Sequence, residues 1–414
     1  MINKRRILYT LIFALPVVLI FTQCLNSYNT KPDPRAEIFA GATTCVKCHK
    51  NIYDSYVHTA HFLSTRPAQL KTISGSFDHD TTFTFNKDLR VVMNKRGDKL
   101  YQTAFFKNQK VDDEPFDITF GGVKAETYLY WKGDKVYQLP MSYFKALHSW
   151  TNSPGFDTTK VNFNRLIGRR CFECHSSYIK EKNVEQQGLN HEVQLDKSSL
   201  IYGIDCERCH GPAANHVNYH TQFPEVKKPM YIKTFASLTR SQRIDVCATC
   251  HSGNAEKTLK SIFTFKPGDN LAQFKEVAFI HRKVDSTKLD VHGNQTQMLE
   301  NSKCFVSSQL ECVTCHDVHK PAGIGGMAVY SAKCLTCHSA TSHNQCKLTS
   351  QLSAMIRNNC IDCHMPNRQS SVIAVQTSGK GQAVPYLVRS HHIAVYKDAA
   401  TLIKSDLKKY NLSN

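Results

Sequence analysis

The segment CERCHGPAANHV, residues 206–217, decides the fold prediction. Two cysteines, Cys206 and Cys209, stand two residues apart, and His210 follows the second one directly. This arrangement is typical of the attachment site for c-type haem. Each thiol adds across one vinyl group of the porphyrin, and the adjacent imidazole then lies beneath the iron as its proximal ligand. One short turn therefore fixes both the covalent bonds and the coordination.

The same five-residue unit occurs seven times in the 414 residues. Its cysteines are Cys45, Cys48, Cys171, Cys174, Cys206, Cys209, Cys247, Cys250, Cys312, Cys315, Cys334, Cys337, Cys360 and Cys363. Its histidines, the expected proximal ligands, are His49, His175, His210, His251, His316, His338 and His364. We therefore predict seven covalently attached c-type haems.

Zinc ribbons and structural disulfides are the alternative interpretations of paired cysteines. A zinc ribbon uses two cysteine pairs and requires no particular residue after either pair. Here the number of cysteine pairs is odd, and His follows every pair. With His at 20 of 414 residues, seven such coincidences have a probability on the order of 10⁻⁹. Three of the 17 cysteines remain: Cys24, Cys304 and Cys346. The last two either form a disulfide or stay as buried thiols.

Thirteen further histidines are available as ligands on the distal face of each iron. The better candidates follow a motif closely, lie in a Gly-containing loop or stand near the end of the chain. They are His61, His216, His292, His319 and His391, and the weaker candidates are His58 and His392. Met is the competing ligand, but only eight are present. We expect mostly bis-His irons, which are coordinatively saturated and suit electron transfer.

The N-terminus is expected to direct export. Lys4, Arg5 and Arg6 precede an apolar run that ends just before Cys24, where a bacterial lipoprotein would be cut and lipidated. Ordinary cleavage nearby and an uncleaved anchor are the alternatives, because Gln23 replaces the small residue usual in that position. The prediction is an export signal of the lipoprotein type over residues 1–23, a tether over 24–40, and a lipid-anchored protein on the periplasmic side of the bacterial cell envelope.

The rest of the chain divides by motif density. A first haem segment covers residues 41–76, a β-rich insert without haem covers 77–164, and a six-haem region of helices and loops covers 165–414. Alternating runs around Gly97 and Gly133 predict antiparallel hairpins in the insert. That sheet either covers haem edges or serves as a docking surface. Because apolar residues are sparse between motifs, porphyrins must supply much of the buried surface, and residues 399–410 are expected to form a terminal helix.

The chain resembles the cytochrome c-554 and hydroxylamine oxidoreductase superfamily. The resemblance rests on the segments CVKCHKNIYDSYVHTAHF (45–62), GIDCERCHGPAANHV (203–217), DVHGNQ (290–295), LECVTCHDVHKP (310–321), CIDCHMPNR (360–368) and RSHHIAVY (389–396). It implies distal roles for His61, His216, His292 and His319 and a late distal His after the last motif. It also implies a predominantly helical fold packed around haem. We accordingly expect a mainly α, haem-packed multihaem cytochrome c with long loops and a small antiparallel β-rich insert.

The expected function is that of an exported heptahaem electron carrier with redox partner proteins in the cell envelope. The alternative, which the resemblance also allows, is an oxidoreductase acting on a small nitrogen or sulfur compound at one five-coordinate haem. No CxxCK motif of the kind used by pentahaem nitrite reductases is present.

The formal charge of +18, from 52 Lys and Arg against 34 Asp and Glu, would by itself suggest nucleic acid, a membrane surface or an acidic partner. Loss of Lys4, Arg5 and Arg6 lowers it to +15. Seven ferric haems, each about −1 with ionised propionates, lower it to about +8. The basic excess is then largely a counter-charge for the haems, so no nucleic-acid partner is expected.

Overall fold

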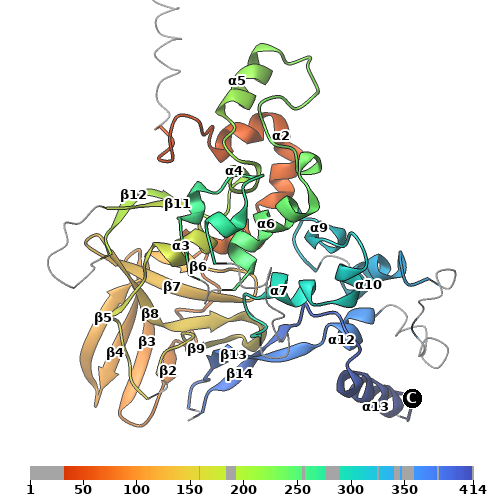
Figure 1. Cartoon of the computed structure of the whole chain (residues 1–414). Coiled ribbons are helices and arrows are strands. Elements are labelled where there is room, and N and C mark those ends of the chain that lie inside the picture. Colours follow the sequence, from red (N-terminus) through yellow and green to blue (C-terminus); the bar gives the residue numbers. More distant parts are fainter. Residues whose placement is uncertain are drawn as a thin grey trace, which may run out of the picture.

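The computed structural model describes residues 32–157, 159–182, 193–253, 257–276, 289–323, 326–339, 346, 359–379 and 382–412. The export signal and Cys24 lie outside these ranges. Antiparallel sheets fill one part of the molecule, and short helices carrying the CxxCH motifs fill the other (Figure 1).

Two antiparallel sheets form the first part. One has the order β2–β3–β4–β5, formed by Thr82–Thr84, Leu89–Arg96, Lys99–Phe106 and Gln109–Pro115. The other has the order β1–β6–β7–β8–β10, with β9 on β8, formed by Thr65–Pro67, Ile118–Phe120, Ala125–Lys132, Lys135–Phe144, Arg165–Leu166 and Ser149–Asn152. The hairpins expected around Gly97 and Gly133 are confirmed as β3–β4 and β7–β8, and both glycines have the positive φ that such tight turns require.

An aromatic core joins the two sheets. Phe83, Tyr128 and Trp150 pack in it, and none of the three is more than 4% exposed. The opposite face of the second sheet packs Leu129 against Phe172, which belongs to a CxxCH helix. The sheets therefore have a core of their own and also support part of the motif region.

Helices of the second part are mostly short. They are α2 (Ala42–Tyr56), α3 (Arg169–His175), α4 (Cys206–His210), α5 (Ala214–Gln222), α6 (Arg240–His251), α7 (Gln295–Glu300), α8 (Lys303–Val306), α9 (Cys312–Cys315), α10 (Gly326–Leu335), α12 (Cys360–His364) and α13 (Lys397–Leu412). The expected terminal helix is confirmed as α13. Among the described residues, no helix is both long and apolar enough to cross a membrane.

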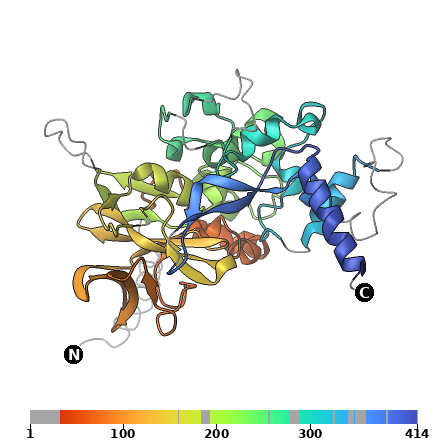
Figure 2. The same cartoon turned by 90° about the horizontal axis from the view of Figure 1, so that it is seen from below.

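Two hairpins lie within the motif-rich part of the sequence: β11–β12 (Tyr178–Glu181 and Leu195–Ile201) and β13–β14 (Asn367–Val375 and Val384–Arg389). Seen from below, β13–β14 extends from the motif helices to the sheets (Figure 2). There the backbone N–H of Gly379 donates to Thr84 O, and the N–H of Gln376 donates to Asn152 Oδ1.

The prediction of a mainly helical fold is wrong. Of the part of the chain that the structure describes, 31% is helical and 26% is strand, with several antiparallel sheets. The physical reason is that a CxxCH motif needs only about one turn of helix, so seven motifs specify little helix, and the segments between them are free to pair as strands. The domain boundaries remain predictions.

Candidate haem sites

Each CxxCH motif lies on or at the end of a helical turn. In order along the chain the seven motifs occupy α2, α3, α4, the end of α6, α9 with the residue after it, the end of α10 with the turn after it, and α12. The fourth of these helices begins with a capping box, in which Thr239 and Gln242 satisfy each other's backbone N–H groups. The motifs thus sit on short turns held by local hydrogen bonds and by their neighbours.

One connected cavity of about 3460 Å³ runs through the motif region and is lined by residues of all seven motifs. A site for one drug-sized ligand measures about 300–1,000 Å³, so this space is large enough for several prosthetic groups. At each motif, cysteine thiol and histidine imidazole side chains line the cavity wall next to each other. These are the groups that c-type haem needs for attachment and coordination. The residues present therefore fit covalently bound haem.

Four motif histidines face a second histidine across this cavity. The ring centres are 6.5 Å apart for His49 and His216, 6.1 Å for His210 and His319, 6.1 Å for His251 and His61, and 6.4 Å for His316 and His391. Metal–imidazole bonds are about 2.0–2.1 Å long, so two imidazoles that share one metal ion have ring centres about 6 Å apart. All four pairs have the spacing that an iron between them requires.

The second motif packs against one of the sheets through its histidine. His175 stacks on Phe120, with ring centres 4.7 Å apart and planes 13° from parallel. Burial lowers the pKa of His175 to about 4, and nearby His292 contributes to the shift. The structure therefore brings His292 into the neighbourhood of this motif, and His292 also lines the cavity.

Burial favours the neutral form of two of the paired imidazoles, His61 and His391. It lowers the pKa of His61 to about 4, with further contributions from His251 and His316. It also lowers the pKa of His391 to about 4, again with His316 and His251 contributing. A neutral imidazole is the form that binds a metal ion.

Hydrogen bonds from the second ring nitrogen orient two of the histidines. His216 Nδ1 lies 2.8 Å from Met230 O, and His364 Nδ1 lies 2.8 Å from Ala394 O. Such bonds fix a ring so that the other nitrogen points at the metal. By contrast, His391 Nδ1 is buried without a hydrogen-bond partner.

The two weaker distal candidates differ in position. His392 lines the cavity, and its Nδ1 lies 2.9 Å from the hydroxyl of Tyr396. The cavity lining does not include the neighbour of His61, His58, although it includes His61 itself. Among the described residues, the structure therefore brings six of the seven candidate distal histidines to the cavity.

Thiols of different motifs lie close enough together to shift one another's pKa. The pairs are Cys45 with Cys206, Cys174 with Cys250, Cys247 with Cys312, and Cys334 with Cys360. Every motif takes part in at least one of these pairs. The attachment points of neighbouring haems are consequently adjacent, although the motifs are far apart in the sequence.

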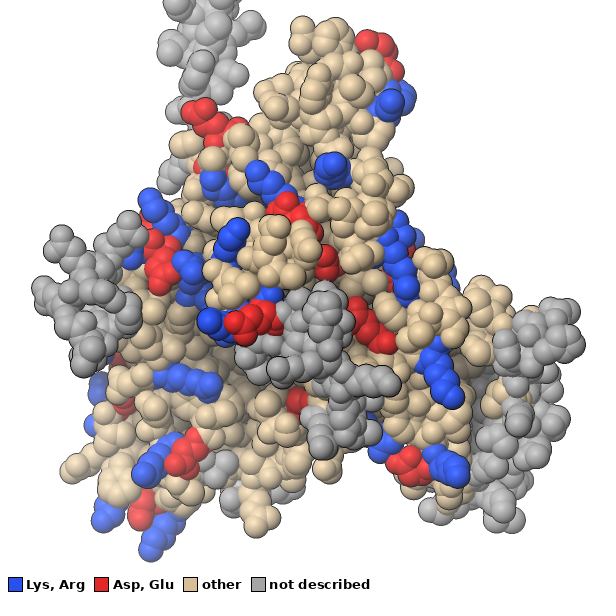
Figure 3. Space-filling view, in the orientation of Figure 1, with Lys and Arg blue, Asp and Glu red and all other residues tan. Residues whose placement is uncertain are grey.

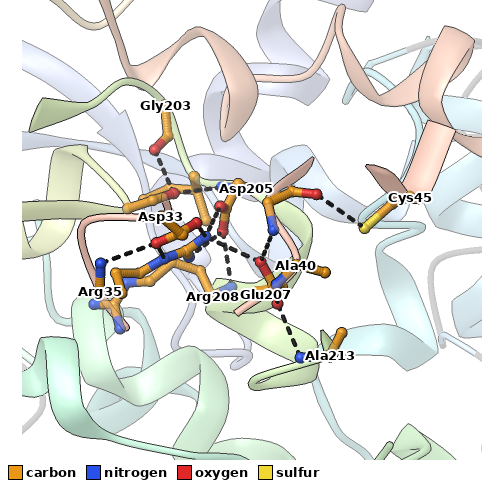
Figure 4. Close-up of polar contacts among 12 residues, drawn as sticks. Asp33, Arg35, Ala40, Cys45, Gly203, Asp205, Glu207, Arg208 and Ala213 are labelled. Carbon is orange, nitrogen blue, oxygen red and sulfur yellow. Dashed lines mark hydrogen bonds and ion pairs between the residues drawn. The ribbon is translucent and has the colours of Figure 1, made fainter. Parts of the chain in front are cut away.

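A buried ionic network joins the first motif helix to the third (Figure 4). Arg35 lies between Asp33, Asp205 and Glu207, with contacts of 2.8, 2.9 and 3.0 Å. The side chain of Arg35 is 4% exposed and that of Glu207 only 1%. An arginine surrounded by three carboxylates is well compensated for the loss of water.

Glu207 also holds three backbone N–H groups. It accepts hydrogen bonds of 2.9 Å from Ala40 N, Gly41 N and Ala213 N. Two of these donors directly precede α2, and the third directly precedes α5. A residue inside the third motif therefore fixes the start of the helix that carries the first.

Sequence reasoning missed Arg35, Glu207 and His220. Arg35 falls in the predicted tether, and Glu207 occupies one of the two variable positions of a motif, where residue type carries no signal for haem. His220 lines the cavity with its ring 4.6 Å from that of His216. The spacing of His216 and His220, one helical turn apart, was the available signal for a shared face.

Comparison with known proteins agrees with these observations. The model of a family described as cytochrome c554 and c-prime matches residues 135–211, which include the second and third motifs. The crystal structure of the outer cell wall cytochrome OcwA superposes with a TM-score of 0.55 at 15% sequence identity, covering 88% of this chain and 81% of that one. Curated protein sequences gave no match.

With its repeated CxxCH motifs, its histidine-lined cavity and these matches, the chain is a multihaem c-type cytochrome. Its haem is bound covalently, and the role that goes with this class is electron transfer. At this level of identity, the resemblance to OcwA shows a shared fold.

Proposed function

We propose that the chain is an exported heptahaem cytochrome that carries electrons along a series of bis-His haems. The observation that carries the proposal is the set of four His–His pairs with ring centres 6.1–6.5 Å apart in one cavity. The seven CxxCH motifs, all of which reach that cavity, support the count of seven.

Haem, when bound, supplies an iron that changes its oxidation state by one electron without a proton. The chain's own residues would attach the haem and bind its iron. The cysteines would hold each haem through two thioether bonds, and the motif histidine would bind one face of its iron. His61, His216, His319 and His391 would fill the other at the fourth, first, third and fifth motifs, and His292 is our assignment for the second. An iron held on both faces has no open position for a substrate, which favours carriage of electrons over catalysis.

The closeness of thiols from different motifs supports a continuous path. The four pairs of thiols that shift each other's pKa link the first motif to the third, the second to the fourth, the fourth to the fifth and the sixth to the seventh. The pKa of Cys247 also responds to Cys209, and that of Cys334 responds to Cys315. These effects connect the third motif with the fourth and the fifth with the sixth. The proposed order is therefore first, third, fourth, fifth, sixth and seventh, with the second joined at the fourth.

We place the protein on the outer side of a bacterial cytoplasmic membrane, attached through lipid on Cys24. The charged and apolar pattern of residues 1–23 supports export. The solved relative is described as an outer cell wall cytochrome, which is consistent with a place outside the cytoplasm. The partners we propose are redox proteins of the cell envelope.

Electron paramagnetic resonance of the oxidised holoprotein tests this proposal. Bis-His coordination predicts low-spin signals from every iron. A high-spin signal that shifts when nitrite, hydroxylamine or a sulfur oxyanion is added would support catalysis at an open haem instead.

A further inference from the structure

A projecting lobe lies at one end of the molecule. It consists of residues 214–233, which comprise α5 and the loop after it, and we call it the α5 lobe (Figure 1). In the space-filling view the lobe stands clear of the body (Figure 3). It carries three exposed lysines, Lys227, Lys228 and Lys233, against one carboxylate, Glu225. Its tip is therefore positive and open to a large partner.

Aromatic rings connect the tip of the α5 lobe to the first haem site. Tyr231 contacts Tyr219 with ring centres 5.4 Å apart, Tyr219 contacts His220 at 5.3 Å, and His220 contacts His216 at 4.6 Å. His216 faces His49 across the first site. Three successive ring contacts thus lead from solvent to the distal ligand.

The outermost ring of this series is presented to solvent in an unusual way. Tyr231 is 62% exposed and has a φ of 57°. A bulky residue with positive φ is a genuine outlier, and such strain is concentrated at functional sites. Phe223, 38% exposed and also in contact with Tyr219, adds a second ring at the same surface.

The start of the described chain is fastened to the base of the α5 lobe. Ala214 N donates a hydrogen bond of 3.0 Å to Ile38 O, and the Arg35 network holds the same segment. Cys24 precedes Asp33 by nine residues, which can span at most about 30 Å. A lipid on Cys24 would therefore keep the lobe near the membrane surface.

We propose that the α5 lobe is the docking surface for an electron-transfer protein with an acidic surface. One electron passes between the partner's redox centre and the iron site of Cys45, Cys48 and His49, across the ring contacts of Tyr231, Tyr219, His220 and His216. One centre is oxidised and the other reduced by that electron, and no proton moves. This inference rests on the proposed electron-transfer function and adds the kind of partner and the place where it binds.

The probe is plastocyanin, a small copper protein with an acidic surface patch. Fully reduced, full-length holoprotein is mixed with Cu(II) plastocyanin, and the loss of the haem α band is followed by stopped flow. Each electron released reduces one Cu(II) to Cu(I). A basic acceptor, mitochondrial cytochrome c, serves as the probe of opposite charge.

Charge reversal at the tip is the first variant. Lys227→Glu, Lys228→Glu and Lys233→Glu together should lower the second-order rate constant with plastocyanin about tenfold or more at low ionic strength, because complementary charge mainly raises the association rate. The rate with the basic acceptor should not fall. The matched control changes Lys87, Lys95 and Lys99, exposed on the β2–β4 strands and turns, to Glu and should alter the plastocyanin rate less than about twofold.

Two single variants keep the proposal decidable if the triple variant loses haem. Lys228→Glu changes a lysine that does not line the cavity and should slow the plastocyanin reaction about threefold. Tyr231→Ser should lower the maximal rate at saturating plastocyanin, because it removes the outermost ring of the series. Phe106→Ser, an exposed aromatic on β4, is its control.

Equal rates for wild type and all of these variants would overturn the docking surface alone. Holoprotein whose haems cannot be reduced and reoxidised reversibly would instead overturn the proposed function. The two failures are therefore distinguishable in the same set of samples.

Discussion

At the scale of single residues, the sequence was informative where the chemistry is local. Two thioether bonds and one imidazole lie within five residues, so each CxxCH motif could be read directly. The distal pairs could not, because His61 and His251, or His316 and His391, meet only through the tertiary fold. The fates of Cys304 and Cys346 were open in the sequence, and among the described residues neither is joined to another cysteine by a disulfide.

His61 and His58 provide the sharpest test of the distal pairing. His61→Ala should open one axial position and convert one iron from low spin to high spin, because His61 faces His251 across the cavity. His58→Ala should leave the spin states unchanged, because His58 does not line the cavity. Electron paramagnetic resonance of the two oxidised variants gives the answer. The same spectrum from both variants would contradict the pairing.

Glu207 should be important for stability. Glu207→Ala removes the acceptor for three backbone N–H groups and leaves Arg35 without one of its carboxylates, which should cost about 3–5 kcal/mol of unfolding free energy. Glu207→Gln keeps an acceptor oxygen and should cost less. Denaturant unfolding, followed by far-UV circular dichroism, measures the difference. The exposed Glu225→Ala is the control, and a loss as large at Glu225 would contradict this role.

At the scale of elements, strands were predictable where turns mark them and were missed elsewhere. Gly97 and Gly133 identified the β3–β4 and β7–β8 hairpins, since tight turns of this kind need positive φ. The β11–β12 and β13–β14 hairpins escaped prediction because they lie among CxxCH motifs, and their pairing depends on contacts with distant segments such as Thr84 and Asn152.

Helix α7 places an acid in the haem cavity. Burial raises the pKa of Glu300 to about 7, above the ordinary value of 4.5, and the charge of the nearby Asp245 contributes a smaller part of this rise. A raised pKa in the folded state favours the protonated form, so the stability contribution is present below about pH 4.5 and is lost as the pH rises through about 7. Glu300→Gln should therefore stabilise the protein by about 1–2 kcal/mol above pH 7 and have little effect near pH 4.5.

Thermal unfolding of wild type and Glu300→Gln at several pH values measures this dependence. Glu276→Gln, an exposed carboxylate, is the control. A constant difference between Glu300→Gln and wild type at all pH values would contradict the assignment.

At the scale of the whole molecule, haem is part of the fold. A cavity of about 3460 Å³ cannot persist empty, because unfilled volume of this size forfeits the contacts of every residue that lines it. The sheets, by contrast, have their own aromatic core around Phe83, Tyr128 and Trp150. This division explains why the sequence could predict a haem-packed region and yet underestimate how much of the chain is strand.

Protein made without haem attachment should therefore lose the motif region and keep the sheets. Limited proteolysis of the haem-free chain should leave a resistant fragment that contains residues 65–166, whereas the holoprotein resists over most of the described chain. Uniform resistance of the haem-free chain, or its complete digestion, would contradict this account.

The mass of the intact holoprotein tests the central claim most directly. The account predicts the mass of the processed polypeptide plus seven haems that survive acid denaturation, because all seven CxxCH motifs reach the same cavity. A mass that shows fewer than seven covalent haems would contradict it.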